Sequence, residues 1–376
     1  MANHYKPSFD AHTYHAPPAY DDVVPVKRWS LIRPKTWGRK TYISLVVIAV
    51  VIIVAAVVGG VEGAKAAAYP NYYALSYTLA DTYSGTSFFD NFDYFTGYDP
   101  SSGFVHYVPA DTSTSYNLTY ASSSSAVVRV DTSSGKYDTT TGRYSVRLTS
   151  KKQYNDGLFI FDVMNAPYGC STWPAVWLSD PSNWPANGEI DVIESVNQAT
   201  WGNQMTLHTT SGCSMNVKRK QTGSTVTTDC YNGTDSNAGC GVSGATDTVG
   251  QAFNKIGGGI YAMEWRNEGI RVWFFQRGSI PSDIPSSVSN STAPDPSTWG
   301  EALADFPSTN CDISSHFRNA SIIVNIDLCG SWAGATSVYS TEDQCPSTCT
   351  DFVAQNASAY STAFWQFNSF RVYTAS

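Results

Sequence analysis

The residues best suited to chemistry form a short acidic run in the middle of the chain. Glu189, Asp191 and Glu194 lie within six residues, and aliphatic side chains separate them. In a β-strand, Glu189 and Asp191 share one face because side chains alternate, whereas Glu194 is out of phase by one residue. A β-bulge after Asp191 would absorb the extra residue and return Glu194 to that face. The run therefore predicts three carboxylates in a row on one face of a sheet.

Carboxylates held this close together raise the pKa of at least one member, so one group can stay protonated while another is ionised. Glycoside hydrolysis requires such a pair, because one group protonates the leaving oxygen while the other attacks the sugar or activates water. The alternative interpretation is a solvated edge strand that is merely acidic.

Three tryptophans, Trp173, Trp177 and Trp184, precede the acidic run. Indole rings in a cleft offer a stacking surface to the apolar faces of sugar rings. We expect Trp177 and Trp184 to act in this way. We assign Trp173 to the core with Trp265 and Trp273, because tryptophan is mostly buried on average.

These segments resemble glycoside hydrolase family 16. Residues 189–194 are similar to the family's E-x-D-x-x-E signature in its bulged, laminarinase-like form. The resemblance extends from about Tyr72 to the C-terminus and is closest to fungal members that cut β-1,3 and mixed β-1,3/1,4 glucans. Four flanking segments also carry it: Trp173–Leu178, Met205–Thr209, Gly269–Phe275 and Gly330–Gly334.

The resemblance implies a role for each acid. Glu189 would be the nucleophile and Glu194 the acid/base of a retaining endo-β-glucanase, with carboxyl groups about 5–5.5 Å apart. Asp191 would hydrogen-bond Glu189 and help to separate the two pKa values. The resemblance implies neither a cofactor nor a catalytic metal.

Further residues are candidates for substrate binding. His208 follows an alternating run and would bind the acid/base or a sugar hydroxyl, with a structural histidine as the alternative. Trp332 is a third candidate sugar platform. Arg147 and Glu264 would contact glucose hydroxyls from concave strands, or else belong to structural ion pairs.

Two other functions remain open on the sequence. A transglycosylase that remodels cell-wall glucan would use a second sugar in place of water as the acceptor. A non-catalytic glucan-binding protein on a lectin-like sandwich is the third hypothesis, and the intact acidic run argues against it.

Short alternating segments without long helical periods predict an all-β sandwich for the large C-terminal part. They include 144–148, 157–163, 260–265, 322–326 and 364–373. The family resemblance refines this to a concanavalin A-like β-jelly-roll with a substrate cleft on its concave face.

The N-terminal region differs in composition. Residues 1–42 are rich in Tyr, Pro and His and predict a disordered tail. Residues 43–61 form an uncharged apolar run long enough to span a membrane. Basic residues precede this run, which predicts a type II anchor with a cytosolic N-terminus. We expect a linker at 62–71 and the catalytic domain at 72–376. A cleaved signal peptide, or clipping between Ala64 and Ala68, is the alternative.

Two features agree with this orientation. All eight cysteines follow the apolar run, as do all five N-x-Ser/Thr sequons, at Asn117, Asn232, Asn290, Asn319 and Asn356. This distribution predicts disulfides and glycans on an extracellular or lumenal domain at the cell surface. A zinc site using Cys345 and Cys349 is the alternative for the cysteines, and eight cysteines leave 105 pairings open.

Charge narrows the range of partners. The formal net charge of the chain is −8. Residues 1–69 carry eight Lys/Arg and four Asp/Glu, so the acidic excess lies entirely in the large domain. An acidic domain repels nucleic acid but not a neutral polysaccharide. We therefore expect a β-glucan as partner, and a monomeric protein.

Overall fold

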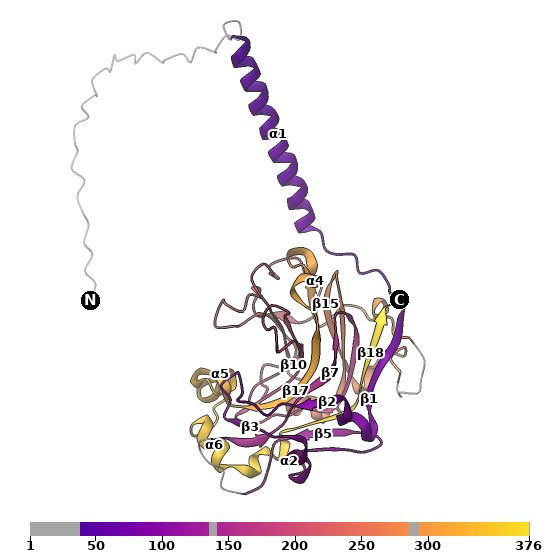
Figure 1. Cartoon of the computed structure of the whole chain (residues 1–376), viewed down its shortest axis with the longest axis vertical. Helices are drawn as coiled ribbons and strands as arrows, with labels where there is room; N and C mark the ends of the chain where they lie inside the picture. Colours follow the sequence, from indigo (N-terminus) through magenta and orange to yellow (C-terminus); the bar gives the residue numbers. More distant parts are fainter. Residues whose placement is uncertain (1–37, 135–140, 286–292, 376) are drawn as a thin grey trace, which may run out of the picture. The chain divides into compact units, whose positions relative to one another are not determined.

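In the computed structural model, two antiparallel eight-stranded sheets make up most of the described residues, which are 38–134, 141–285 and 293–375. The cleft sheet has the order β12-β13-β11-β10-β9-β17-β7-β2, and the outer sheet has the order β16-β15-β14-β8-β18-β5-β4, with β1 paired to β18. Figure 1 shows β10, β17 and β7 in one layer and β15 and β18 in the other. The predicted β-sandwich is confirmed.

The strands of the cleft sheet are β2 (Phe92–Tyr94), β7 (Arg147–Tyr154), β9 (Thr172–Ser179), β10 (Glu189–Glu194), β11 (Gln204–His208), β12 (Ser224–Thr225), β13 (Cys240–Ser243) and β17 (Ala320–Leu328). Those of the outer sheet are β1 (Tyr77–Ser84), β4 (Thr119–Ala121), β5 (Ala126–Arg129), β8 (Gly157–Asn165), β14 (Gly259–Arg266), β15 (Gly269–Gln276), β16 (Ala304–Pro307) and β18 (Phe364–Ala375). A separate parallel pair joins β3 (Val105–Tyr107) and β6 (Arg143–Ser145).

The helices of this domain are short and lie at the ends of the sandwich (Figure 1). They are α2 (Ala110–Ser115), α3 (Gly250–Lys255), α4 (Ile313–His316), α5 (Gly330–Ala333) and α6 (Cys349–Gln355). Short 3₁₀ helices cover Gly85–Asn91, Arg277–Ser279, Pro296–Thr298, Ser308–Asn310 and Ala357–Thr362, and a π-helical turn covers Ser337–Glu342.

The main core lies between the two sheets. On β17, Ile322, Val324 and Ile326 point inward and are fully buried. Phe159 and Phe161 of β8 meet them from the outer sheet. Because side chains alternate along a strand, the residues between these face the other side of the cleft sheet, where Asn325 and Asp327 line the cleft.

A second, smaller core covers the far face of the outer sheet. Ile260 and Ala262 of β14 pack there against Trp273, which is 2% exposed. Every residue of β14 is therefore buried, because both of its faces are covered. The predicted core positions of Trp265 and Trp273 are confirmed.

Four disulfides use all eight cysteines: Cys170–Cys345, Cys213–Cys311, Cys230–Cys240 and Cys329–Cys349. The alternative zinc pair is excluded, since Cys345 and Cys349 belong to different bridges. The first bridge closes a segment of 175 residues and ties the start of β9 to the region before α6.

The helix α1 (Arg39–Ala67) contains the apolar run. An 18-residue window within its span Arg39–Gly60 has a mean hydropathy of 3.1, and none of that window is buried by protein. The helix continues into the expected linker because Ala and other good helix formers follow the apolar run. Residues 1–37 of the expected tail lie outside the described part of the chain. Among the described residues, those up to Gly60 and those from Val61 onward belong to two separate compact units.

Residues 69–76, here called the strap, precede β1 and pack on the outer sheet. The Tyr72 hydroxyl donates to Asp305 Oδ1 at 3.2 Å, and the guanidinium of Arg271 lies 4.1 Å from the centre of the Tyr72 ring. Arg266 Nη1 donates to the carbonyl of Tyr73 at 2.9 Å. The expected linker therefore ends in a segment that is fixed to the domain by specific contacts.

Candidate active site

The bulge predicted after Asp191 is present in β10. Asp191 pairs with Trp177 of β9 and Ile193 pairs with Val176, so Val192 is the extra residue between them. Glu189, Asp191 and Glu194 consequently line the same cleft. The aliphatic residues between them are at most 1% exposed and anchor the strand in the core.

A glycine brings the chain into this strand. Gly188 has φ +74°, and a Cβ at this position would lie 2.3 Å from a ring carbon of Phe317. Only glycine meets both conditions without strain. The close packing against Phe317 fixes the point at which Glu189 enters the cleft.

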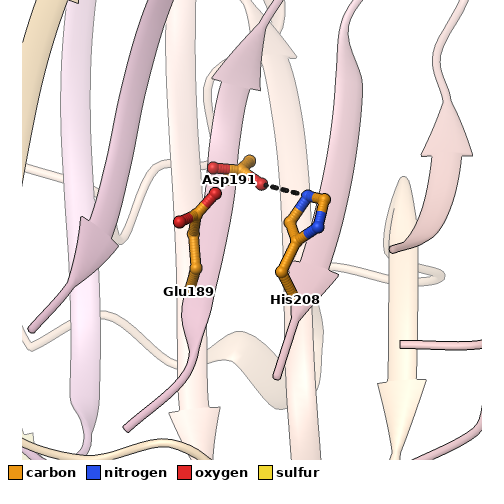
Figure 2. Close-up of side chains that lie close together, drawn as sticks. All are labelled: Glu189, Asp191 and His208. Carbon is orange, nitrogen blue, oxygen red and sulfur yellow. Dashed lines mark ion pairs between the residues drawn. The ribbon is translucent and has the colours of Figure 1, made fainter. Parts of the chain in front are cut away.

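His208 faces the acids from β11, where it is the direct partner of Glu189. Its Nε2 lies 3.3 Å from Asp191 Oδ2, and one donor atom from each of the three side chains lies within 4.8 Å of the others. Figure 2 shows Asp191 and His208 pointing toward each other, with Glu189 beside them. His208 Nδ1 lies 3.1 Å from Asn237 Oδ1, so both ring nitrogens have a partner.

The loop after His208 comes close to the imidazole because Gly239 lacks a side chain. A Cβ there would lie 2.7 Å from the ring, at a backbone with φ +63°. Asn237, two residues earlier, can therefore reach the histidine and line the cleft.

The two glutamates have raised pKa values. Burial, reinforced by the negative charge of Asp191, raises the pKa of Glu189 to about 7, although His208 and a hydrogen bond from Trp184 oppose the shift. Burial and the charge of Asp191 raise the pKa of Glu194 well above its usual range. Both glutamates therefore hold their protons to higher pH than an exposed carboxyl group does.

His208 is a cation at neutral pH. Burial alone lowers the pKa of an imidazole, but contact with Asp191 and the charges of the two glutamates outweigh it and raise the pKa of His208 to about 9. The site therefore holds three carboxyl groups facing one buried cation.

Glu194 is held by an indole that we had assigned to the core. Trp173 Nε1 donates to Glu194 Oε1 at 2.8 Å, and Trp173 lines the cleft. The core assignment of Trp173 was wrong. The sequence did contain the signal, because Trp173 and Trp177 are four residues apart on one strand and must share a face.

Trp332 of α5 packs against the indole ring of Trp173. Its ring lies edge-on to that of Trp173, with centroids 5.7 Å apart and planes at 89°. Trp332 is partly exposed and adjoins Ser331, which lines the cleft, so its role as a sugar platform stays a prediction.

Trp177 and Trp184 both line the cleft, as expected for sugar platforms. Trp184 is 39% exposed, so its ring is accessible. Trp177 Nε1 donates to Asn325 Oδ1 at 2.8 Å, and its ring contacts the Arg147 guanidinium, whose centre is 5.0 Å away. Its indole N–H is therefore already satisfied by the protein.

Arg147 also lines the cleft. Its guanidinium lies between two aromatic rings, 4.8 Å from the centre of Phe95 and 5.0 Å from that of Trp177. The stacking leaves the edge of the group as the part that can donate hydrogen bonds.

Glu264 lies outside the cleft. It belongs to β14 of the outer sheet, is 2% exposed, and pairs with Arg271. The expected position on a concave strand was wrong, because alternation alone cannot tell which sheet a strand joins. Its other predicted role, in a structural ion pair, matches its contacts.

The donor set of Glu189, Asp191 and His208 is compact enough to hold a metal ion. A metal would have to displace the proton of His208, whose pKa is raised to about 9, and would occupy the carboxylate of Glu189. The chemistry of these side chains fits acid–base and nucleophilic roles without such an ion.

Several residues of the site could not be identified from the sequence. Asn203, Asn237, Asn325 and Asp327 are isolated polar residues, and only the fold brings them to the cleft or to β10.

Residues 92–373 match the family model described as the XgeA-like catalytic GH16 domain. The chain belongs to glycoside hydrolase family 16. It is 44% identical over 310 residues to a protein of Schizosaccharomyces pombe named a probable glycosidase, with 81% of this chain and 71% of that protein covered. It is 38% identical over 307 residues to an endo-1,3(4)-beta-glucanase of Arthroderma benhamiae, with 79% of this chain and 65% of that protein covered.

Solved structures agree with this family 16 assignment. The laminarinase 16A of Phanerochaete chrysosporium, in complex with 6-O-glucosyl-laminaritriose, aligns with a TM-score of 0.75 and 41% identity over 80% of this chain and all of the other. An elongating family 16 β-1,3-glucosyltransferase aligns with a TM-score of 0.73 and 39% identity over the same shares.

Proposed function

We propose that this family 16 enzyme is a retaining endo-β-glucanase that hydrolyses β-1,3 and mixed β-1,3/1,4 glucans. One observation carries the proposal: the bulge in β10 presents Glu189 and Glu194 to a single cleft, where burial and the charge of Asp191 raise the pKa of both. Two such carboxyl groups in one cleft fit a nucleophile paired with a general acid.

In the first step, the Glu189 carboxylate attacks the anomeric carbon while protonated Glu194 gives its proton to the glycosidic oxygen. The bond between anomeric carbon and glycosidic oxygen breaks, and the leaving sugar departs as an alcohol. A covalent glycosyl ester on Glu189 remains.

In the second step, Glu194 is a carboxylate and acts as base. It takes a proton from water while the water oxygen attacks the anomeric carbon, so that Glu189 is released and Glu194 is protonated again. Asp191 and protonated His208 keep their places throughout and stabilise the charge that moves between the glutamates.

The proposed substrate class follows from the lining of the cleft. Trp177 and Trp184 offer aromatic faces to glucose rings, and the edge of Arg147 offers donors to hydroxyl groups. The Phanerochaete and Arthroderma relatives, named for laminarinase and endo-1,3(4)-beta-glucanase, support glucans with β-1,3 linkages.

A transglycosylase is the second candidate. The similarity to an elongating β-1,3-glucosyltransferase favours it, as does the apolar helix, since an enzyme that builds wall glucan stays near its product. The chemistry differs only in the second step, where a sugar hydroxyl replaces water.

Product analysis distinguishes the candidates. We expect the purified full-length protein to convert a single laminari-oligosaccharide into shorter oligomers, and to cut laminarin and lichenan internally. Products longer than the starting oligomer would establish the transferase instead. Binding of the oligomer without any change in its length would support the sugar-binding protein.

We also propose that α1 anchors the enzyme as a type II membrane protein with the glucanase domain outside the cytosol. The uncovered apolar span, the disulfides and the position of the sequons all support this orientation. Protease protection of sealed vesicles, followed with tags at each end of the chain, tests it. Cleavage of an N-terminal tag from the extracytosolic side would reverse the assignment.

A further inference from the structure

The bulge that returns Glu194 to the cleft breaks the ladder between β10 and β11. These strands pair only over residues 189–191, opposite 206–208. Beyond Asp191, the main-chain groups of β10 on this side lose their strand partner. Buried main-chain groups without partners are costly, so another group must replace the ladder.

The replacement is the side chain of Asn203. Its Oδ1 accepts a hydrogen bond from the main-chain N–H of Glu194 at 2.8 Å, and its Nδ2 donates to the carbonyl of Val192 at 2.9 Å. One amide group thus binds the extra residue of the bulge and the glutamate that follows it.

Asn203 is itself rigidly held. It is fully buried immediately before β11. Its main-chain N–H donates to Thr248 Oγ1 at 2.8 Å, and its carbonyl accepts from the N–H of Gly244 at 2.8 Å. Because its main chain is fixed on both sides, the amide group can transmit a fixed position to β10.

We propose that Asn203 is a positioning residue for Glu194: by bonding both Val192 and Glu194, it holds the bulge that keeps the Glu194 carboxyl in the cleft. Loss of the amide leaves the main-chain N–H of Glu194 and the carbonyl of Val192 without these hydrogen bonds, which destabilises the bulge. The strand can relieve that destabilisation by shifting its register, and a shift of one residue turns a side chain to the opposite face.

Loss of the Asn203 amide should displace Glu194 but leave Glu189 in place. Glu189 lies before the bulge, where the ladder to His208 of β11 is intact. Asn203 makes no hydrogen bond to Glu189 in the described part of the chain. This inference rests on the proposed role of Glu194 as acid/base, and it predicts a defect in proton donation rather than in nucleophilic attack.

The test uses the full-length protein and compares its activity on two substrates that differ only in their leaving group. A laminari-oligosaccharide needs a proton from Glu194 as its bond breaks, whereas the 2,4-dinitrophenyl glycoside of the same oligomer releases a stable anion unaided. For Asn203→Leu, we expect kcat/KM on the oligosaccharide to fall about 30-fold, as for other misplaced catalytic groups. We expect kcat/KM on the aryl glycoside to change less than about threefold.

Asn254→Leu is the matched control. Asn254 forms the same kind of bridge, with Oδ1 accepting from the Ala166 N–H at 2.8 Å and Nδ2 donating to the Ala166 carbonyl at 2.9 Å. It lies in α3, away from the cleft-lining residues. We expect this variant to leave both kcat/KM values unchanged. If Asn203→Leu fails to fold, Asn203→Ala leaves room for water and gives the same comparison.

The outcomes separate the two proposals. Equal losses on both substrates, or no loss on either, would overturn the role of Asn203 while leaving the proposed function intact. If the unaltered protein cleaved neither substrate, the proposed function would fail and the role of Asn203 with it.

Discussion

Each sheet carries a cluster of charged side chains, and the carboxylates of the two clusters differ in the number of partners that they have. On the outer sheet, Glu264 Oε1 accepts from the Tyr77 hydroxyl at 2.8 Å, and Oε2 accepts from Arg271 Nε at 3.0 Å. Arg266 lies 3.6 Å from the same carboxylate. On the cleft sheet, three carboxyl groups face the cation of His208, the charge of Arg147 also acts on Glu189, and each glutamate receives one indole donor.

The comparison shows what separates a structural carboxylate from a reactive one. Glu264 accepts a hydrogen bond from Tyr77 and contacts two guanidinium groups, so it joins neighbouring strands. Glu189 and Glu194 have too few donors for their burial, and their pKa values rise into a range where protons can be exchanged. The two clusters therefore differ in the number of donors that each carboxylate receives.

The strongest test of this contrast is Glu189→Gln. The amide keeps the size of the side chain but cannot form the glycosyl ester, so we expect kcat to fall by about 10⁴-fold or more. Isothermal titration should still detect binding of a laminari-oligosaccharide, since the aromatic platforms are intact. Turnover within tenfold of the unaltered protein would remove Glu189 from the role of nucleophile.

Glu264→Gln should lower the stability of the protein and leave kcat/KM of the folded protein largely unchanged. Breaking a buried ion pair leaves the cations of Arg271 and Arg266 undercompensated, and we expect a loss of about 3–5 kcal/mol in the free energy of unfolding. The measurement is chemical denaturation alongside kcat/KM at a temperature where the variant is folded. A fall in kcat/KM without a loss of stability would mean that the outer cluster serves catalysis.

His208→Gln tests the cation of the cleft. Its positive charge lowers the pKa of both Glu189 and Glu194, so its removal should raise both. Activity requires Glu189 ionised and Glu194 protonated, so both limbs of the pH profile of kcat/KM should move to higher pH. We expect each limb to shift by about one pH unit, as is typical when a neighbouring charge is lost. An unmoved profile would assign His208 a purely structural role.

Trp173→Phe should have the smallest effect, a shift of only the alkaline limb of the pH profile of kcat/KM. The hydrogen bond from Trp173 lowers the pKa of Glu194 and does not reach Glu189. We expect the alkaline limb alone to rise, by about one unit, because a hydrogen bond to a charged group contributes about 1.5–3 kcal/mol. Movement of the acid limb by the same amount would show that the indole acts on the whole site.

The sequence could predict this fold and the acidic row because both depend on local periodicity. Alternation identified the strands, and the odd spacing between Asp191 and Glu194 required a bulge, which is present. The cysteines following the apolar run indicated disulfides, and all eight are paired. Motif similarity supplied the family.

The sequence could not predict which sheet each strand joins, and the errors follow from that. Glu264 was assigned to the cleft because its strand alternates like the others, but strand order depends on contacts distant in sequence. Asn203 gave no signal, since its importance lies in the main chain of another strand. Trp173 was missed by applying an average burial tendency where the two-residue period already decided its face.

The strap also bears on how the enzyme can be released. A protease cutting between Ala64 and Ala68 would leave Tyr69, Tyr72 and Tyr73 on the shed product, together with their contacts to Lys220, Asp305 and Arg266. The liberated glucanase would keep its second core and all four cystine bridges. If α1 anchors the enzyme as proposed, hydrolysis of a single peptide bond in this region would convert a membrane-bound glycosidase into a diffusible one.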